Sequence, residues 1–147
     1  MKKLMKVESF LRMSKGGTIP YAIQRFTGDT ERLWDVLDIR LKDRDYIVGP
    51  GSGKYSIADI VIFPWINVGF FAGVEIEQFP NVHRWYKAIA ARPGVKRGLN
   101  VPAPPYSTLE MHEKQMRESP EYAESESKAK KIVDDAKKEF GYKLSAP

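Results

Sequence analysis

The segment most suggestive of chemistry is the glycine-rich loop at residues 49–54, Gly-Pro-Gly-Ser-Gly-Lys. A phosphate-binding P-loop has four residues between its two glycines and a Ser or Thr directly after the Lys, where it holds Mg²⁺. Here three residues separate Gly49 from Gly53, and Tyr55 follows Lys54. The spacing therefore predicts a turn and disfavours a nucleotide-binding site.

Metal and nucleophile chemistry find little support in the residue types. The chain contains no cysteine, which excludes disulfides, thiolate zinc sites, iron–sulfur clusters and a cysteine nucleophile. The histidines, His83 and His112, lie in separate segments without a His or acidic partner at metal-ligand spacing, and we expect His83 on a solvent-facing side of its helix. No Ser, Tyr or acid forms a recognisable nucleophile–base pattern. We predict no metal site and no catalytic residue within this chain.

The net charge of +5 over 147 residues is concentrated at one end. Residues 1–17 contribute four of these charges, whereas residues 121–143 balance six acids with six lysines. A nucleic-acid-binding surface needs a basic stripe across the folded face. The distribution predicts a short basic arm or helix remnant at residues 1–17 and argues against nucleic-acid binding.

The apolar stretch at residues 57–74 approaches membrane-spanning length. Asp59, Pro64 and Asn67 interrupt it, and only residues 60–66 are continuously apolar. The N-terminus lacks the apolar core and small-residue cleavage site of a secretory signal. We therefore expect a cytoplasmic protein without a membrane span.

Hydrophobic periodicity predicts an all-α fold. Between residues 20 and 43, apolar residues recur every three or four positions, which is typical of a long amphipathic helix. The residues of this expected inward face are Ile23, Phe26, Leu33, Leu37 and Leu41.

The helix expected at residues 56–71 has the strongest start signal in the sequence. Ser56 can accept a hydrogen bond from the backbone three residues on, and Asp59 can accept one from the Ser56 N–H, which together form a capping box. The residues that follow are apolar on nearly all sides, which predicts a helix buried at the centre of a bundle. Pro64 is expected to kink it.

A third helix is expected to begin near Pro80 and to bury Val82, Trp85 and Ile89, and a short turn follows at residues 95–99. The composition then changes. Residues 100–106 contain three prolines and predict an extended linker. A second capping box at residues 107–110 opens a short helix, and a longer Lys/Glu-rich helix runs from Ser119-Pro120 to Gly141. The expected organisation is an arm at 1–17, a helical domain at 18–102 and a charged tail at 103–147 that packs over it.

Several of these segments belong to a longer pattern. It comprises Tyr-Ile-Val-Gly at residues 46–49, Tyr-Ser-Ile-Ala-Asp-Ile-Val-Ile-Phe-Pro-Trp at 55–65, Phe-Pro-Asn-Val-His-Arg-Trp at 79–85 and Ala-Ala-Arg-Pro-Gly-Val at 90–95. This pattern closely resembles the C-terminal all-helical domain of the cytosolic glutathione transferases, in particular the fungal and nu-like bacterial subfamilies. The resemblance covers residues 18–102 and implies that Ser56 and Asp59 form the family's helix-capping motif.

The resemblance also implies what is missing. In that family, an N-terminal thioredoxin-like domain carries most glutathione contacts and the residue that activates the thiol, and this chain has no room for it. We therefore expect the hydrophobic-substrate domain of an enzyme that conjugates or reduces small electrophiles with glutathione, as in detoxification. Glutathione as co-substrate requires the thioredoxin-like half, without which the chain is expected to be inactive. A fragment, a truncated paralogue and a stand-alone module all remain open.

The expected partners are a thioredoxin-like half or a second copy in a homodimer, together with apolar small molecules. The resemblance makes Tyr21, Arg25, Trp65 and Phe70 candidate substrate-binding residues, although buried aromatic residues are more often part of a core. Two non-catalytic readings remain as alternatives: a protein-interaction module and a carrier of hydrophobic ligands.

Overall fold

The computed structural model describes residues 19–101 and 108–141. Within these ranges the chain forms six α-helices, two short 3₁₀ helices and no strand, which confirms the all-α class. The expected basic arm and most of the proline-rich linker lie outside the described residues. In order, the elements are α2 (Pro20–Leu41), α3 (Ile57–Asn67), η1 (Gly69–Ala72), η2 (Ile76–Gln78), α4 (Pro80–Ala90), α5 (Pro93–Leu99), α6 (Leu109–Glu118) and α7 (Pro120–Phe140).

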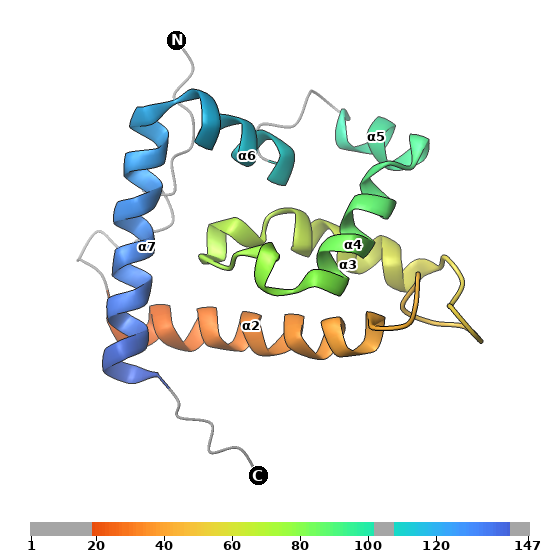
Figure 1. The fold of residues 1–147 in the computed structure, drawn as a ribbon, viewed down its shortest axis with the longest axis horizontal. Helices are drawn as coiled ribbons and strands as arrows, with labels where there is room; N and C mark the ends of the chain where they lie inside the picture. Colours follow the sequence, from red (N-terminus) through yellow and green to blue (C-terminus); the bar gives the residue numbers. More distant parts are fainter. Residues whose placement is uncertain (1–18, 102–107, 142–147) are drawn as a thin grey trace.

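The two tail helices pack against the rest of the bundle. In Figure 1, α2 runs along the bottom, α7 crosses its N-terminal end, and α6 leads into α7 at the top. Lys137 on α7 forms an ion pair with Glu31 on α2. Tyr21 and Phe140 add an edge-to-face ring contact with centroids 5.9 Å apart. These contacts hold α7 against α2.

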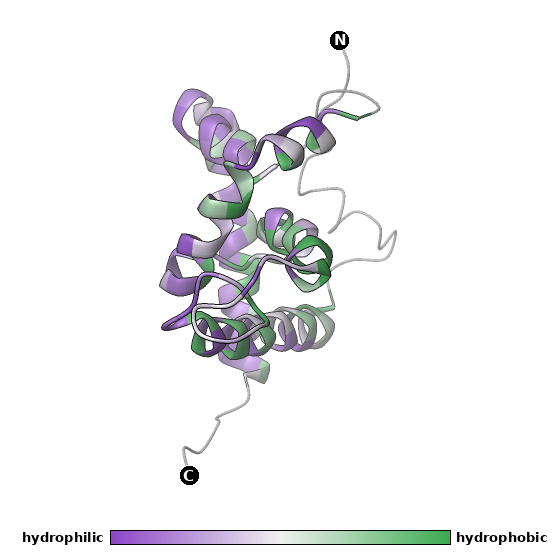
Figure 2. Ribbon diagram, turned by 90° about the vertical axis from the view of Figure 1, so that its right-hand side faces the viewer, coloured by the Kyte–Doolittle hydropathy of each residue, from purple (hydrophilic) through white to green (hydrophobic). Residues whose placement is uncertain are grey.

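The core is centred on α4. Val82, Trp85 and Ile89 are almost completely buried, as the sequence predicts. The Phe63 ring of α3 stacks on Tyr86 at 5.3 Å, and Trp34 of α2 meets Phe79 edge to face. Hydrophobic and hydrophilic residues lie side by side along the same helices in Figure 2, as expected for amphipathic elements that share one core.

The inward face of α2 differs from the predicted one. Gln24, Thr27, Trp34 and Leu41 are buried, whereas the predicted core residues Phe26 and Leu33 are 65% and 57% exposed. The reason is tertiary: the Thr27 hydroxyl donates to the Ala72 carbonyl at 3.1 Å, and the Trp34 ring packs directly over Gly69. Because of these contacts, the face of α2 that packs against the core differs from the face predicted from hydrophobic periodicity alone.

The start of α4 depends on a residue from another helix. Its N-cap position, Phe79, provides no side-chain acceptor. Instead, the Asp38 carboxylate on α2 accepts from the backbone N–H groups of Asn81 at 2.8 Å and Val82 at 3.0 Å. A carboxylate at a helix N-terminus satisfies free donors and interacts favourably with the helix dipole. This contact fixes α4 against α2.

The expectation that the apolar helix is buried on all sides was wrong. Only Asp59, Phe63, Ile66 and Asn67 of α3 are buried, because the helix lies at the edge of the described bundle. Its outer face is apolar yet exposed. The expected span of 56–71 is also divided at Val68, where α3 ends and η1 begins, and Pro64 lies inside α3. The exposed residues, which we name the α3 face, are Ile57, Ile60, Val61, Pro64 and Trp65.

The first residues of α6 and α7 lie close to the positions predicted from the sequence. Thr108 caps α6 by accepting from Met111 N at 3.2 Å, so the cap falls at the second residue of the predicted box. Ser119 caps α7 by accepting from Tyr122 N at 3.2 Å, as predicted. The loop at 49–54 is a turn, in which Gly49, Gly51 and Gly53 all have positive φ.

Candidate functional site

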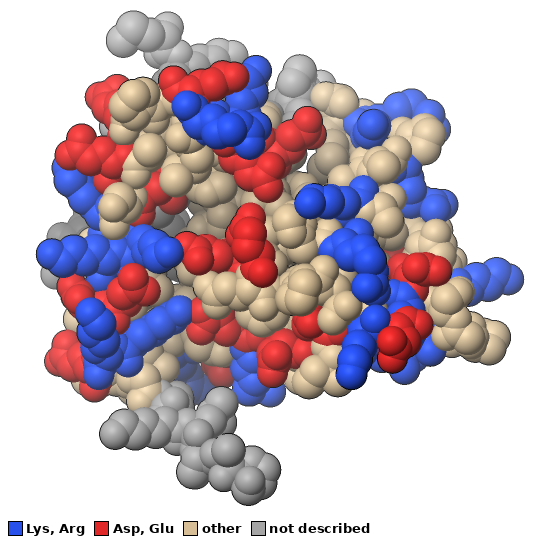
Figure 3. Space-filling view, in the orientation of Figure 1, with Lys and Arg blue, Asp and Glu red and all other residues tan. Residues whose placement is uncertain are grey.

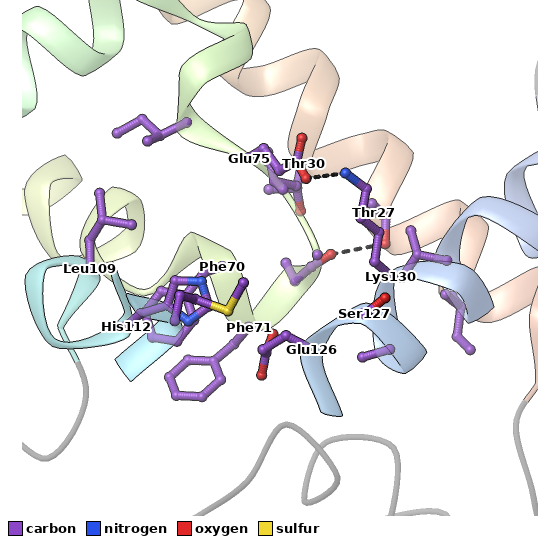
Figure 4. A pocket seen from close by; sticks show the side chains of 18 of the residues that line it. Thr27, Thr30, Phe70, Phe71, Glu75, Leu109, His112, Glu126, Ser127 and Lys130 are labelled. Carbon is purple, nitrogen blue, oxygen red and sulfur yellow. Dashed lines mark hydrogen bonds and ion pairs between the residues drawn. The ribbon is translucent and has the colours of Figure 1, made fainter. Parts of the chain in front are cut away.

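A large apolar cavity lies between the N-terminal half of α2, the η1–η2 segment, α6 and α7. Its volume is about 1130 Å³. Figure 4 shows side chains from these elements pointing toward one another around it. A space of this size exceeds that of typical small-molecule pockets, which measure roughly 300–1,000 Å³. The principal apolar wall residues are Ile23, Phe26, Phe70, Phe71, Leu109 and Met116.

The cavity walls are tied together by specific contacts. The Thr27–Ala72 hydrogen bond joins α2 to η1, and Lys130 of α7 forms an ion pair with Glu75. Both contacts are drawn as dashed lines in Figure 4. Gly73, with φ of 72°, turns the chain after η1 and lets the Val133 side chain approach closely. The hydrogen bond therefore links α2 to the end of η1, and the ion pair links α7 to the residue that precedes η2.

One wall carries a polar group within the apolar lining. The His112 ring stacks on Phe70 with centroids 4.4 Å apart, and His112 Nδ1 lies 2.9 Å from the Tyr122 hydroxyl. Burial lowers the pKa of His112, and the charge of Glu77 opposes this shift. Burial raises the pKa of Tyr122 to about 12, with the Glu126 carboxyl adding to the shift. Both side chains are thus neutral near pH 7 and act as hydrogen-bonding groups.

Glu126 on α7 is the least well satisfied group of the lining. Burial raises the pKa of its carboxyl group, while a hydrogen bond from Tyr122 opposes the shift. Its Oε1 atom is buried and has no hydrogen-bond partner among the described residues. An unpartnered buried oxygen is costly, and the cost is larger when the group is ionised. Glu126 therefore favours its neutral form more than an ordinary glutamate does.

The Glu126→Gln variant tests this assignment. When the pKa of a carboxyl group is higher in the folded state than in the unfolded state, its ionisation lowers the free energy of unfolding. This loss disappears at pH values below the pKa that the group has in the unfolded chain. We expect the variant to be more stable than the wild type at about pH 7, with the difference shrinking as the pH falls toward about 4. Urea unfolding followed by circular dichroism at both pH values measures it.

The matched control for this experiment is Glu139→Gln, an exposed position on the same helix. Its stability difference from the wild type is expected to stay small at both pH values. A Glu126→Gln difference that is constant with pH would show that Glu126 ionises like an exposed carboxyl group.

Three polar residues from separate elements meet at the rim of the cavity. Ligand atoms of Glu77, His83 and Glu113 all lie within 4.8 Å of one another. Glu77 and Glu113 also line the cavity. Sequence spacing gives His83 no acidic partner and a solvent-facing position, yet the structure places it half-buried beside these two carboxylates. This cluster of three residues cannot be recognised from sequence spacing, because η2, α4 and α6 each supply one of them.

The structure brings one of the four candidate substrate-binding residues to the cavity. Phe70 lines it and is buried. Trp65 is 72% exposed on the α3 face, away from the lining. Tyr21 is half-exposed beside Phe140, and Arg25 pairs with Asp29 at 4.0 Å on the outer side of α2.

Ser56 and Asp59 form the predicted capping box and have a structural role. The Ser56 hydroxyl accepts from Ala58 N at 3.2 Å, and the Asp59 carboxylate accepts from Ser56 N at 2.9 Å. Asp59 is completely buried, and it also accepts from Trp85 Nε1 at 2.9 Å and Ile47 N at 3.2 Å. The sequence predicts the local bonds but gives no signal for the two distant donors.

None of the helices in the described residues is long and apolar enough to cross a membrane.

Comparison with known proteins covers the part of the chain from α2 to α4, but not α6 and α7, which supply the rest of the cavity lining. Residues 24–93 match the family model described as "Glutathione S-transferase, C-terminal domain". The chain is 38% identical over 82 residues to disulfide-bond oxidoreductase YfcG of Escherichia coli, which covers 56% of this chain and 37% of YfcG. It is 36% identical over 89 residues to glutathione S-transferase 2 of Schizosaccharomyces pombe, covering 51% and 37%. The chain thus spans little more than a third of the length of these relatives.

Proposed function

We propose that this chain, which carries a helical domain of the glutathione S-transferase C-terminal type, binds apolar small molecules in its cavity and forms the hydrophobic-substrate side of a glutathione-dependent protein. The observation that carries the proposal is the cavity itself. Aromatic and aliphatic side chains dominate its lining, and burial of apolar surface there is the main source of binding energy for such ligands. The names of the matched relatives, an oxidoreductase and a transferase, favour thiol chemistry.

We infer that the group that activates the thiol comes from outside the described residues. Attack by the glutathione sulfur on an electrophile requires a thiolate, and a nearby donor or positive charge usually lowers the pKa of the thiol. His112 and Tyr122 are engaged with each other, and burial shifts the pKa of each toward the neutral form. A thioredoxin-like partner would supply glutathione and its activation.

If the thiol-activating group comes from such a partner, the chain purified by itself should show no glutathione conjugation of an aryl halide above the uncatalysed rate. Absorbance of the conjugate in the presence and absence of the chain measures the rate. Turnover that a single Tyr122→Phe or His112→Gln substitution abolishes would mean that the cavity contains the thiol-activating group.

The α3 face supports the view that a partner covers part of this domain. All five of its residues are apolar and most of them are at least half exposed. Exposed apolar patches of this kind on soluble domains commonly mark interaction surfaces. This observation also favours the second candidate function, a non-catalytic interaction module that uses the α3 face and not the cavity.

Binding of an uncharged fluorescent apolar dye separates the two candidate functions. We expect Ala123→Trp, which places a large ring in the cavity wall, to weaken dye binding by about tenfold or more. The Ala88→Trp variant makes the same change at an exposed position of α4 and should leave the affinity unchanged. Fluorescence titration at equal protein concentrations measures both.

A Trp65→Gln variant completes the comparison. It removes the largest exposed side chain of the α3 face. If dye binds in the cavity, this variant keeps the wild-type affinity. Loss of binding in Trp65→Gln together with wild-type binding in Ala123→Trp would support the interaction module and contradict the cavity as a ligand site.

A further inference from the structure

Some acidic side chains of the cavity lining have a basic partner and others do not. Glu75 is neutralised by its ion pair with Lys130. Arg117, on α6, is the other basic residue of the lining, and neither Glu77 nor Glu113 forms an ion pair with it or with another described residue within 4.0 Å. Two carboxylates therefore lie close together at one end of an apolar space, and no described Lys or Arg pairs with either of them.

Placing like charges this close is unfavourable, and a positive group between them removes the cost. On the face drawn in Figure 3, acidic side chains, with basic ones among them, lie around a hollow bordered by α6 and α7. Glu77 belongs to η2 and Glu113 to α6, so the pair joins two elements across the cavity rim. The arrangement combines a region that favours positive charge with an adjoining region that favours apolar surface.

We propose that the cavity selects amphiphilic cations, with the apolar part of the ligand between α2, α6 and α7 and a protonated amine at the Glu77 and Glu113 carboxylates. The inference rests on the proposed function, because it names the class of apolar molecule that the cavity prefers. An ammonium group donates up to three hydrogen bonds, and charge-assisted bonds to carboxylates are the strong ones. His83 can accept the remaining bond when its ring is neutral.

A metal ion is the competing occupant of the three rim residues. Their mixed nitrogen and oxygen ligands suit a first-row divalent cation. A metal ion, however, makes no use of the apolar cavity that begins beside the same two carboxylates. An organic amine satisfies both regions at once, and this is why the geometry favours it.

The experiment compares three ligands with nearly the same apolar body: 2-(1-naphthyl)ethylamine, 2-(1-naphthyl)ethanol and 1-naphthylacetic acid. Each displaces the uncharged dye from the full chain at low salt and about pH 8, where alkylamines remain charged. We expect the amine to bind about tenfold more tightly than the alcohol and the acid to bind more weakly than either.

Paired variants locate the charge effect. In Glu77→Gln/Glu113→Gln, the amine should lose its advantage while the alcohol keeps its wild-type affinity. The control, Glu121→Gln/Glu139→Gln, makes the same change in net charge at exposed positions of α7 outside the lining, and it should retain the preference for the amine.

The outcomes separate this inference from the proposed function. If the alcohol and the amine bind equally to the wild type, the inference fails while the cavity remains a ligand site. If neither displaces the dye and the dye itself does not bind, the proposed function fails. Tight binding of Mn²⁺ or Zn²⁺ that the Glu77→Gln/Glu113→Gln variant abolishes, with no preference for the amine, would identify the rim as a metal site and overturn the amine assignment.

Discussion

Replacing Asp59 with alanine is expected to lower the free energy of unfolding by about 3–5 kcal/mol, because it removes a helix cap and leaves buried donors unsatisfied. The carboxylate is completely buried and accepts hydrogen bonds from Ser56, Ile47 and Trp85. The local capping box alone would account for only about 1–2 kcal/mol. The larger value reflects the donors of the 46–49 segment and of α4, which lose their acceptor inside the protein.

Urea unfolding followed by circular dichroism measures the effect, and the Ser56→Ala variant is its control. That variant removes the bond from Ala58 N and the bond that the Ser56 hydroxyl donates to Asp59 at 3.3 Å. It leaves in place the three N–H donors of Ser56, Ile47 and Trp85, so it should cost about 1 kcal/mol. If Asp59→Ala costs no more than Ser56→Ala, the carboxylate contributes only the local cap, and the bonds to Trp85 and Ile47 do not stabilise the fold.

Gly69→Ala is expected to destabilise the chain by about 3 kcal/mol, because overpacking a filled core forces side chains and backbone to shift. A Cβ at this position would lie 2.2 Å from Cζ2 and 2.3 Å from Cη2 of the Trp34 ring. Both residues are buried, so the ring has little space into which it can move. Thermal or urea unfolding of the variant measures the loss.

The matched control is Gly94→Ala on α5, where an added Cβ meets nothing within 4 Å. This substitution should be neutral or slightly stabilising, since it only restricts the unfolded chain. A second arm combines Gly69→Ala with Trp34→Leu. Trp34→Leu should cost less in the Gly69→Ala background than in the wild type if the clash with the ring is the cause. Equal costs in both backgrounds would contradict the predicted contact.

Local sequence signals predicted the helix starts well. A capping box involves residues only three positions apart, so Ser56 and Asp59 reveal it without knowledge of the fold. The buried face of α4 was also predictable, because Val82, Trp85 and Ile89 recur at helical spacing and the amphipathic contrast is strong. These features depend on neighbours along the chain.

Features that depend on distant residues were missed or wrong. Trp34 and Thr27 face inward because of Gly69 and Ala72, which are more than thirty positions away. The α4 cap comes from Asp38, and no spacing rule connects that residue to Asn81. The prediction that α3 is buried on all sides was also wrong. A continuous apolar run indicates residues that avoid water, but it does not show whether other parts of this chain cover them.

The cavity residues, too, divide into those that the sequence singled out and those that depend on distant contacts. The family resemblance made Phe70 a candidate substrate-binding residue. His112 was considered only as a metal ligand, and Glu126 only as part of a charged tail. Their roles arise because α6 and α7 fold back over α2 and η1, which brings residues 70, 112 and 126 to one wall. The sequence predicts a tail that packs over the domain, but it does not indicate which tail residues face the cavity.

The most direct test of the central claim is where a bound apolar ligand lies. Intermolecular nuclear Overhauser effects between a naphthalene ligand and the protein locate it by distance. We predict contacts from the ligand to the side chains of Ile23, Phe70, Met116 and Val133, which line the cavity. Contacts confined to Ile57, Val61 and Trp65 on the α3 face would contradict the claim that this domain holds its ligand in the cavity.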